Sequence, residues 1–204
     1  MRIGIFGGSF DPIHIGHLII AEQSREHAQL DEVWFIPAAV APHKQTGATA
    51  TGKQRLEMLQ LAVAGHESFR VLDDELRRGE VSFTVDTLRS FRAQYPDHEW
   101  FLIIGGDSAA QLATWREPAE ICRLATPLVY FRPGEVADFS PLANLVSPER
   151  LADIAAHRVS GPMIELSSTL VRERLASGRT VRYLVPRAVE KYIETQDLYR
   201  PDDG

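Results

Sequence analysis

Short apolar runs alternate with amphipathic stretches along this chain, and the alternation predicts strands separated by helices. Most of the apolar runs are continuous, as expected for strands that are buried on both faces of a parallel sheet. The predicted strands are Arg2–Phe6, Glu32–Ile36, Phe69–Asp73, Trp100–Ile104, Pro127–Phe131 and Pro162–Leu166. The predicted helices between them are His14–Ala28, Gly52–Ala64, Thr84–Tyr95 and Glu117–Leu124. We therefore expect an α/β fold with right-handed crossovers.

The C-terminal part of the chain has a helical pattern instead. Ser167-Ser168 is suited to cap a helix over Thr169–Ala176, and Pro186 suits the first turn of a last helix that reaches about Thr195. The complete prediction is a single domain over residues 1–204. It would contain one Rossmann-like, doubly wound, mostly parallel sheet with helices on both faces, and a C-terminal helical portion at about 167–196.

Two segments interrupt the alternation and are predicted to be loops. Ala38–Gly52 is rich in Ala, Thr, Pro and Gly, and Pro133–Pro148 contains scattered Pro, Ser and Asn. The first segment is long enough to be a mobile substrate-binding loop. The second carries no diagnostic motif.

Composition narrows the class of protein. No apolar run approaches the roughly 18 residues that a membrane span needs. The first residues lack a signal-peptide core, so we expect a cytoplasmic protein without a membrane partner. Cys122 is the only cysteine, which excludes an internal disulfide and a cysteine-rich zinc site. A net charge of −6 without a dense Lys/Arg block disfavours nucleic acid as a partner, whereas a small anion in one basic cleft is still allowed.

A glycine turn and two histidines follow the first predicted strand. Gly7-Gly8-Ser9 would end the strand, and exposed N–H groups there can bind phosphate oxygens. The spacing fits neither the dinucleotide fingerprint nor a P-loop, so the glycines alone are equally consistent with a tight turn. His14 and His17 are three residues apart and would share one helix face, where Gly16 leaves room for a bulky group. No third ligand is obvious nearby, so the pair does not predict a metal site.

The first of these stretches reads Gly8-Ser9-Phe10-Asp11-Pro12-Ile13-His14-Ile15-Gly16-His17, and a second reads Leu166-Ser167-Ser168-Thr169-Leu170-Val171-Arg172. The first resembles the signature of the H-x-G-H nucleotidyltransferase superfamily. The second resembles the I-S-S-T-x-I-R motif of the same superfamily, with Leu166 and Val171 as mild apolar departures. The two motifs lie near opposite ends of the chain, which makes a chance coincidence very improbable.

Further segments resemble the bacterial nicotinate-nucleotide adenylyltransferases, and this likeness covers most of the chain. Gly106 stands where that family more often has Ala. The segments are Ile36-Pro37 with Pro42-His43-Lys44, Arg55–Leu59, Ser82–Leu88, Ile104–Asp107 with Trp115, and Tyr183–Pro186 with Val189 and Tyr192-Ile193.

The resemblance implies adenylyl transfer from ATP to nicotinate mononucleotide, giving nicotinate adenine dinucleotide and pyrophosphate in NAD biosynthesis. The attacking phosphate is already anionic at pH 7, so the reaction needs neither a general base nor a covalent intermediate. Catalysis then consists of holding two anions in line and stabilising the charge that develops between them. Mg²⁺ should accompany ATP, although no carboxylate cluster marks a direct metal ligand.

The resemblance also implies roles for individual residues. The catalytic set is His14, His17, Lys44 and Arg172. The ATP-binding set is Gly8, Ser9, Phe10, His14, Gly16, His17, Asp107, Ser168, Thr169 and Arg172. The set that binds nicotinate mononucleotide is Asp11, Lys44, Thr84, Gly106, Asp107 and Trp115.

For some of these residues, two alternative roles are predicted. Asp11 would either order the turn or orient a phosphate through a neighbour. The indole of Trp115 would stack on the pyridine ring, with Thr84 or nearby amides at the carboxylate. On the residues alone, Trp115 would more often be a packing residue, Lys44 a solvated loop lysine and the run Asp73-Asp74-Glu75 a solvated face.

Alternative functions are also open. A related enzyme would act on nicotinamide mononucleotide or phosphopantetheine, because the first motif is shared among these enzymes. Thr84 and Trp115 favour a pyridine nucleotide, but they separate acid from amide only weakly. A nucleotide-binding sensor without turnover is disfavoured by the intact His14, His17 and Arg172. The oligomeric state is not predicted.

Overall fold

A six-stranded sheet forms the centre of the computed structural model, which describes residues 1–40, 49–131 and 138–200. The strand order is β3-β2-β1-β4-β5-β6, and all five pairings are parallel. The strands are β1 (Arg2–Gly8), β2 (Glu32–Pro37), β3 (Phe69–Val71), β4 (Glu99–Gly105), β5 (Thr126–Phe131) and β6 (Arg158–Ser160). This is the doubly wound order expected from the sequence, and it confirms the predicted fold class.

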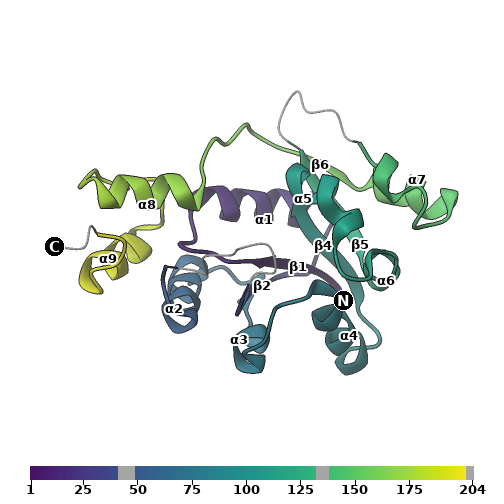
Figure 1. Cartoon of the computed structure of the whole chain (residues 1–204), viewed down its shortest axis with the longest axis horizontal. Coiled ribbons are helices and arrows are strands. Elements are labelled where there is room, and N and C mark those ends of the chain that lie inside the picture. Colours follow the sequence, from purple (N-terminus) through teal and green to yellow (C-terminus); the bar gives the residue numbers. More distant parts are fainter. Residues whose placement is uncertain (41–48, 132–137, 201–204) are drawn as a thin grey trace.

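Helices cover both faces of the sheet (Figure 1). Helix α1 lies on one face, and α3 and α4 lie on the other. The helices are α1 (Ile15–His27), α2 (Gly52–Val63), α3 (Asp74–Arg78), α4 (Thr84–Gln94), α5 (Gly106–Gln111), α6 (Pro118–Leu124), α7 (Pro148–Ala156), α8 (Ser168–Ala176) and α9 (Arg187–Thr195). No helix within the described residues is long and apolar enough to cross a bilayer.

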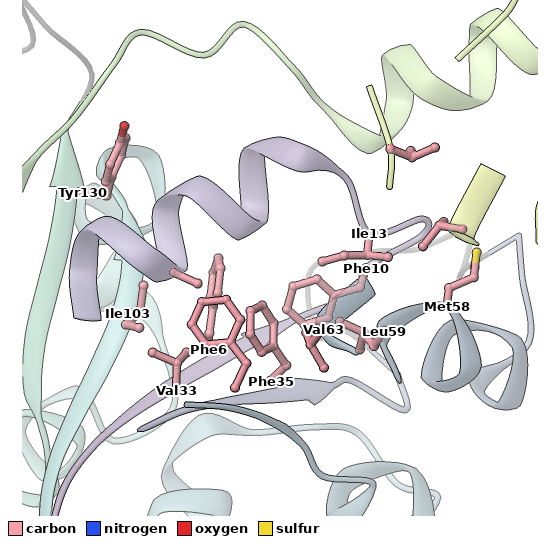
Figure 2. Close-up of a cluster of buried hydrophobic side chains, with 14 of the residues drawn as sticks. Phe6, Phe10, Ile13, Val33, Phe35, Met58, Leu59, Val63, Ile103 and Tyr130 are labelled. Carbon is pink, nitrogen blue, oxygen red and sulfur yellow. The ribbon is translucent and has the colours of Figure 1, made fainter. Parts of the chain in front are cut away.

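Two hydrophobic cores follow from the two-residue period of the strands. Ile3 and Ile5 of β1 point to one face, and Phe6 points to the other. Figure 2 shows the core around Phe6, where Phe35 of β2 packs beneath α1 and Met58 of α2 lies farther along. Both sides of the central strands are therefore buried, which explains why their sequences are continuously apolar.

The sixth strand was predicted in the wrong place. It is Arg158–Ser160, which pairs with β5, and not Pro162–Leu166. The segment Pro162–Leu166 is not a strand. It passes above α1 without pairing with the sheet, and we call it the strap (Figure 1). Pro162 lacks a backbone N–H for a strand ladder. The apolar residues of the strap, Ile164 and Leu166, face a cavity described below instead of a neighbouring strand.

Short helices and one acidic run also differ from the prediction. Helices α3, α5 and α7 were not predicted. The first two have only five and six residues, and α7 begins at Pro148, where the predicted loop ends. Glu75, predicted to lie on a solvated face, is only 6% exposed. Its carboxylate accepts a hydrogen bond from the Thr87 hydroxyl at 2.6 Å, and Arg78 donates to that same hydroxyl oxygen at 2.7 Å. The carboxylate is buried because α4 supplies its partner.

Candidate functional site

The turn between β1 and α1 has a tightly specified backbone. Phe10 has a φ of 47°, in the left-handed region that costs energy for a residue with a side chain. Its ring is 2% exposed and packs edge-on against the Phe6 and His17 rings. The aromatic core therefore anchors this strained residue, whereas Gly8 and Ser9 before it are partly exposed.

Asp11 is a buried carboxylate that holds the end of the 38–52 segment. It is 3% exposed, and it accepts hydrogen bonds from the N–H groups of Thr49 (2.7 Å) and Ala50 (3.1 Å). These contacts support the first of its two predicted roles, the ordering of the turn. Lys44, together with Pro42 and His43, lies outside the described residues.

His14 and His17 stack at the start of α1. Their ring centroids are 3.7 Å apart, and the backbone N–H of His14 donates to His17 Nδ1 at 3.3 Å. His14 is 4% exposed, and its Nδ1 has no hydrogen-bond partner among the described residues. Burial lowers the pKa of His14 to about 4, so the ring is neutral at pH 7 when no anion is bound. A buried nitrogen without a partner is the arrangement expected of a group that awaits a ligand.

The second signature folds onto the first. Helix α8 begins at Ser168, whose hydroxyl donates to the Pro12 carbonyl at 2.9 Å. Arg172, one turn later, donates to the Asp11 carbonyl at 2.7 Å and to the Thr169 hydroxyl at 3.3 Å. The helix N-terminus and its guanidinium are thus fixed to the β1–α1 turn, which brings positive potential to the same place from a distant part of the chain.

The first of two neighbouring cavities lies above the carboxyl ends of β1 and β4. These strands are paired and their crossovers leave in opposite directions, so this is the switch point where α/β sheets bind ligands. The cavity has a volume of about 100 Å³. Four of the lining residues were predicted for the site: His14, Gly16, Gly106 and Asp107. The other lining residues were not predicted, and they are Ile20, Gly105, Tyr130, Ile164 and Leu166.

Gly16 is closely packed in that cavity. A Cβ atom at this position would lie 3.0 Å from His14 Nδ1 and 3.3 Å from the Ile164 side chain. Tyr130 fixes the strap from the other side, because its hydroxyl donates to the Pro162 carbonyl at 2.8 Å. Figure 2 shows the Tyr130 hydroxyl pointing toward this strap.

The second cavity, of about 240 Å³, extends from the glycine turn toward α4. Its lining includes Gly8, Ser9, Thr84 and Trp115, so the glycine turn borders the same cavity as the residues predicted for the pyridine end. A pocket of about 430 Å³ continues beyond it and shares Ser82, Thr84 and Trp115. Trp115 is half-buried, with part of its side chain packed on the core and part lining both hollows.

Several lining residues carried no recognisable signal. These residues are Tyr130 on β5, Ser108 on α5 and Glu75 on α3. The sequence does not show which other segments pack beside these elements. Tyr130 stands at the carboxyl end of a predicted strand, which is the position that would have marked it. Conversely, Ser168, Thr169 and Arg172 border neither cavity, and Phe10 contributes its ring to the core.

The described residues contain no group of three or more His, Cys, Asp or Glu side chains that could hold a metal ion. Asp107, exposed in the first turn of α5, is the carboxylate that lines the first cavity. A metal ion at this place would therefore depend on oxygens supplied by a ligand.

Comparisons with known proteins agree with this geometry. Residues 5–174 match the cytidylyltransferase-like family. The chain is 43% identical to a probable nicotinate-nucleotide adenylyltransferase of Salinibacter ruber over the full length of both, and 43% identical to one of Shouchella clausii over 97% of this chain and 96% of that protein.

Solved structures show the same fold at low sequence identity. Nicotinic acid mononucleotide adenylyltransferase of Plasmodium falciparum, complexed with NaAD, superimposes with a TM-score of 0.75 at 17% identity over 97% of each chain. A putative nicotinate-nucleotide adenylyltransferase from Vibrio parahaemolyticus gives a TM-score of 0.69 at 19% identity, covering 98% of this chain and 95% of that one. The chain therefore belongs to the cytidylyltransferase-like family and, within it, to the nicotinate-nucleotide adenylyltransferases.

Proposed function

We propose that this protein transfers the adenylyl group of ATP to nicotinate mononucleotide. A phosphate oxygen of the mononucleotide forms a bond to the α-phosphorus of ATP, and the bond from that phosphorus to the β-phosphate oxygen breaks. The products are nicotinate adenine dinucleotide and pyrophosphate. The observation that carries this assignment is that Gly8 and Ser9 line one cavity together with Thr84 and Trp115. His14 lines a separate cavity, and both cavities border the carboxyl end of β4, at Ile104 and Gly105.

The nucleotide end is suited to a triphosphate. His14 has a buried Nδ1 with no hydrogen-bond partner in the part of the chain that the structure describes, and Arg172 and the N-terminus of α8 lie against the same turn. Binding of a phosphate would satisfy the imidazole and raise its pKa from the value of about 4, because a nearby anion stabilises the protonated form. His14, His17 and Arg172 would then stabilise charge on the α-phosphate and the departing pyrophosphate, without abstracting a proton.

The acceptor end is suited to a flat aromatic acid. Trp115 offers an indole face for stacking on a pyridine ring, which is electron-poor in the mononucleotide. Helix α4 begins at Thr84, which lines the hollow, and its N-cap residue Phe83 makes no side-chain cap hydrogen bond among the described residues. The N–H groups at the start of this helix could therefore bind a carboxylate. Arg116 lines the outer pocket, where its guanidinium lies 4.7 Å from the centre of the Phe83 ring and 3.4 Å from the Asp86 carboxylate, which balances part of its charge. These features favour the acid over the amide.

Magnesium belongs to the same proposal. It would arrive with ATP and neutralise the phosphate oxygens, and Asp107 is the carboxylate of the first cavity that could approach it through water. We further propose that the enzyme works in the cytoplasm, in line with its place in NAD biosynthesis.

Pyrophosphate release from the purified protein tests the function directly. ATP and Mg²⁺ are supplied with nicotinate mononucleotide, nicotinamide mononucleotide or phosphopantetheine in separate reactions. We expect turnover with the acid, at least about tenfold lower kcat/KM with the amide because a charge-assisted hydrogen bond is lost, and none with phosphopantetheine.

Each alternative has its own outcome in this assay. Preference for the amide would move the assignment to nicotinamide mononucleotide, and turnover with phosphopantetheine alone would refute a pyridine acceptor. ATP binding measured by calorimetry, without turnover on any of the three acceptors, would identify a nucleotide sensor.

A further inference from the structure

The last described turn of the chain reaches back to the candidate active site. Tyr199, 188 positions after Asp11, donates its hydroxyl to Asp11 Oδ1 at 2.7 Å. The tyrosine is 8% exposed and belongs to the hydrophobic core that contains Phe10 and Ile13. Its φ is 61°, so its backbone occupies a conformation that is costly for a side-chain-bearing residue. A strained backbone at this position is consistent with a side chain that must reach one particular partner.

The partner carboxylate links three segments of the chain. Asp11 Oδ1 receives both the Tyr199 hydroxyl and the Ala50 N–H, and Oδ2 receives the Thr49 N–H. The carbonyl of the same aspartate accepts the Arg172 guanidinium. Movement of the Asp11 side chain would therefore displace the turn that precedes His14, the 49–50 backbone and the Arg172 contact together.

Positive charge around the carboxylate comes from Arg55 and Arg172. Arg55 is 2% exposed, and it donates to the Ser9 carbonyl at 2.7 Å and to the Ala50 carbonyl at 3.3 Å. Burial lowers the pKa of Arg55, and the Asp11 carboxylate opposes that effect. The Tyr199 hydroxyl thus completes the hydrogen bonding of an anion that two guanidinium groups surround, and burial together with that anion raises the pKa of the phenol.

We propose that Tyr199 is a positioning residue for adenylyl transfer, which fixes the Ser9–His14 turn in its working geometry through the Asp11 carboxylate. The inference rests on the proposed function for its kinetic consequence only. The hydroxyl touches neither cavity, so it acts through Asp11 and not on a substrate. Its effect should fall on the transition state, where the turn and His14 must match the phosphates most exactly.

The chain contains a matched control. Tyr192, on α9, donates its hydroxyl to the Glu57 carboxylate on α2. This pair also joins the C-terminal part of the chain to an N-terminal helix, but Glu57 has no contact with the β1–α1 turn among the hydrogen bonds of the described residues. Tyr192→Phe and Tyr199→Phe therefore remove the same chemical group from the same kind of partner, and only the second touches Asp11.

The experiment compares both variants with the wild type in two ways. In steady-state kinetics, Tyr199→Phe should lower kcat roughly tenfold and change the KM for nicotinate mononucleotide less than about twofold, whereas Tyr192→Phe should leave both within about twofold. In the ligand-free protein, the amide hydrogens of Thr49 and Ala50 should exchange roughly tenfold faster in Tyr199→Phe and at the wild-type rate in Tyr192→Phe.

The outcomes separate this inference from the proposed function. If the wild type turns over none of the acceptors, the function fails, and the exchange measurement alone still decides whether Tyr199 holds the 49–50 backbone. Unchanged kcat and unchanged exchange in Tyr199→Phe would overturn the inference. Equal losses in the two variants, or a lower melting temperature with unchanged kcat, would also overturn it by assigning the hydroxyl a role in stability only.

Discussion

The two ends of the candidate site are built in different ways. The phosphate end is polar and rigid: His14 is buried, Phe10 has a left-handed backbone, and Arg172 binds the Asp11 carbonyl. The pyridine end is a larger and more apolar hollow, in which Thr84 begins α4 and Trp115 follows the short helical turn Leu112–Thr114. Charge stabilisation demands fixed donors with little freedom, whereas a flat ring can be held by one aromatic face and a few amides.

This difference explains how the two ends should respond to mutation. Groups that bind developing charge act in the transition state, so their loss should lower kcat. A stacking residue binds the substrate and the transition state about equally, so its loss should raise KM. The following predictions test that division, beginning with the largest expected effect.

Removal of the His14 imidazole should damage the phosphate end most. His14→Ala should lower kcat/KM by about 10²–10³-fold, because a preorganised donor at the developing charge is lost. The dissociation constant of nicotinate mononucleotide, measured by calorimetry without ATP, should change less than about threefold, since a stacking contact does not involve this side chain. His27→Ala is the control, because His27 is exposed at the far end of the same helix. A loss confined to KM for the mononucleotide would contradict the assigned division.

Removal of the Trp115 indole should damage the pyridine end. Trp115→Ala should raise the KM for nicotinate mononucleotide by about 10–100-fold, which corresponds to one lost stacking contact. The KM for ATP should change less than about threefold, and Trp115→Phe should recover most of the affinity because it restores an aromatic face. Equal increases for both substrates would show that Trp115 serves packing, the alternative that its partial contact with the core permits.

The smallest of the expected effects is on stability: the unfolding free energy of the ligand-free protein should fall as the pH is lowered. His14 has a pKa of about 4 in the folded protein and 6.5 as its ordinary value, so the unfolded chain binds the proton more readily. Its contribution to stability is therefore present at neutral pH and is lost as the pH falls from 6.5 toward 4. Between pH 7.5 and 5.5 the wild type should lose about 1 kcal/mol more unfolding free energy than His14→Gln, as measured in urea. Parallel pH profiles would refute the buried, neutral imidazole.

The fold was predictable where the hydrophobic pattern is strong. The central strands β1, β2, β4 and β5 were found because burial on both faces makes them continuously apolar. The pattern failed for β6, whose one buried residue is Val159, and it mistook the strap around Ile164 for a strand. Apolar residues that line a cavity and apolar residues in a sheet have the same composition, so sequence alone could not separate them.

The candidate site was predictable in the same uneven way. The histidines and the Ser168–Arg172 segment were found because each belongs to a short sequence motif that resembles one of the nucleotidyltransferases. Tyr130 and Glu75 were missed because their relevance depends on β5 and α3 lying at the carboxyl edge of the sheet. The single-domain organisation and the individual binding roles stay predictions, as does the role of Lys44, which lies outside the described residues.

The sequence by itself determined the class of fold through the spacing of its apolar runs. It indicated the phosphate chemistry through the resemblance of its glycine, histidine and arginine motifs to those of the nucleotidyltransferases. Only the tertiary structure decided what those motifs do together. It joined Arg172 to the Asp11 carbonyl, buried His14 deeply enough to lower its pKa to about 4, and brought Tyr199 to Asp11. Burial and long-range hydrogen bonds are properties of packing, and packing between distant segments is not written in any one stretch of the chain.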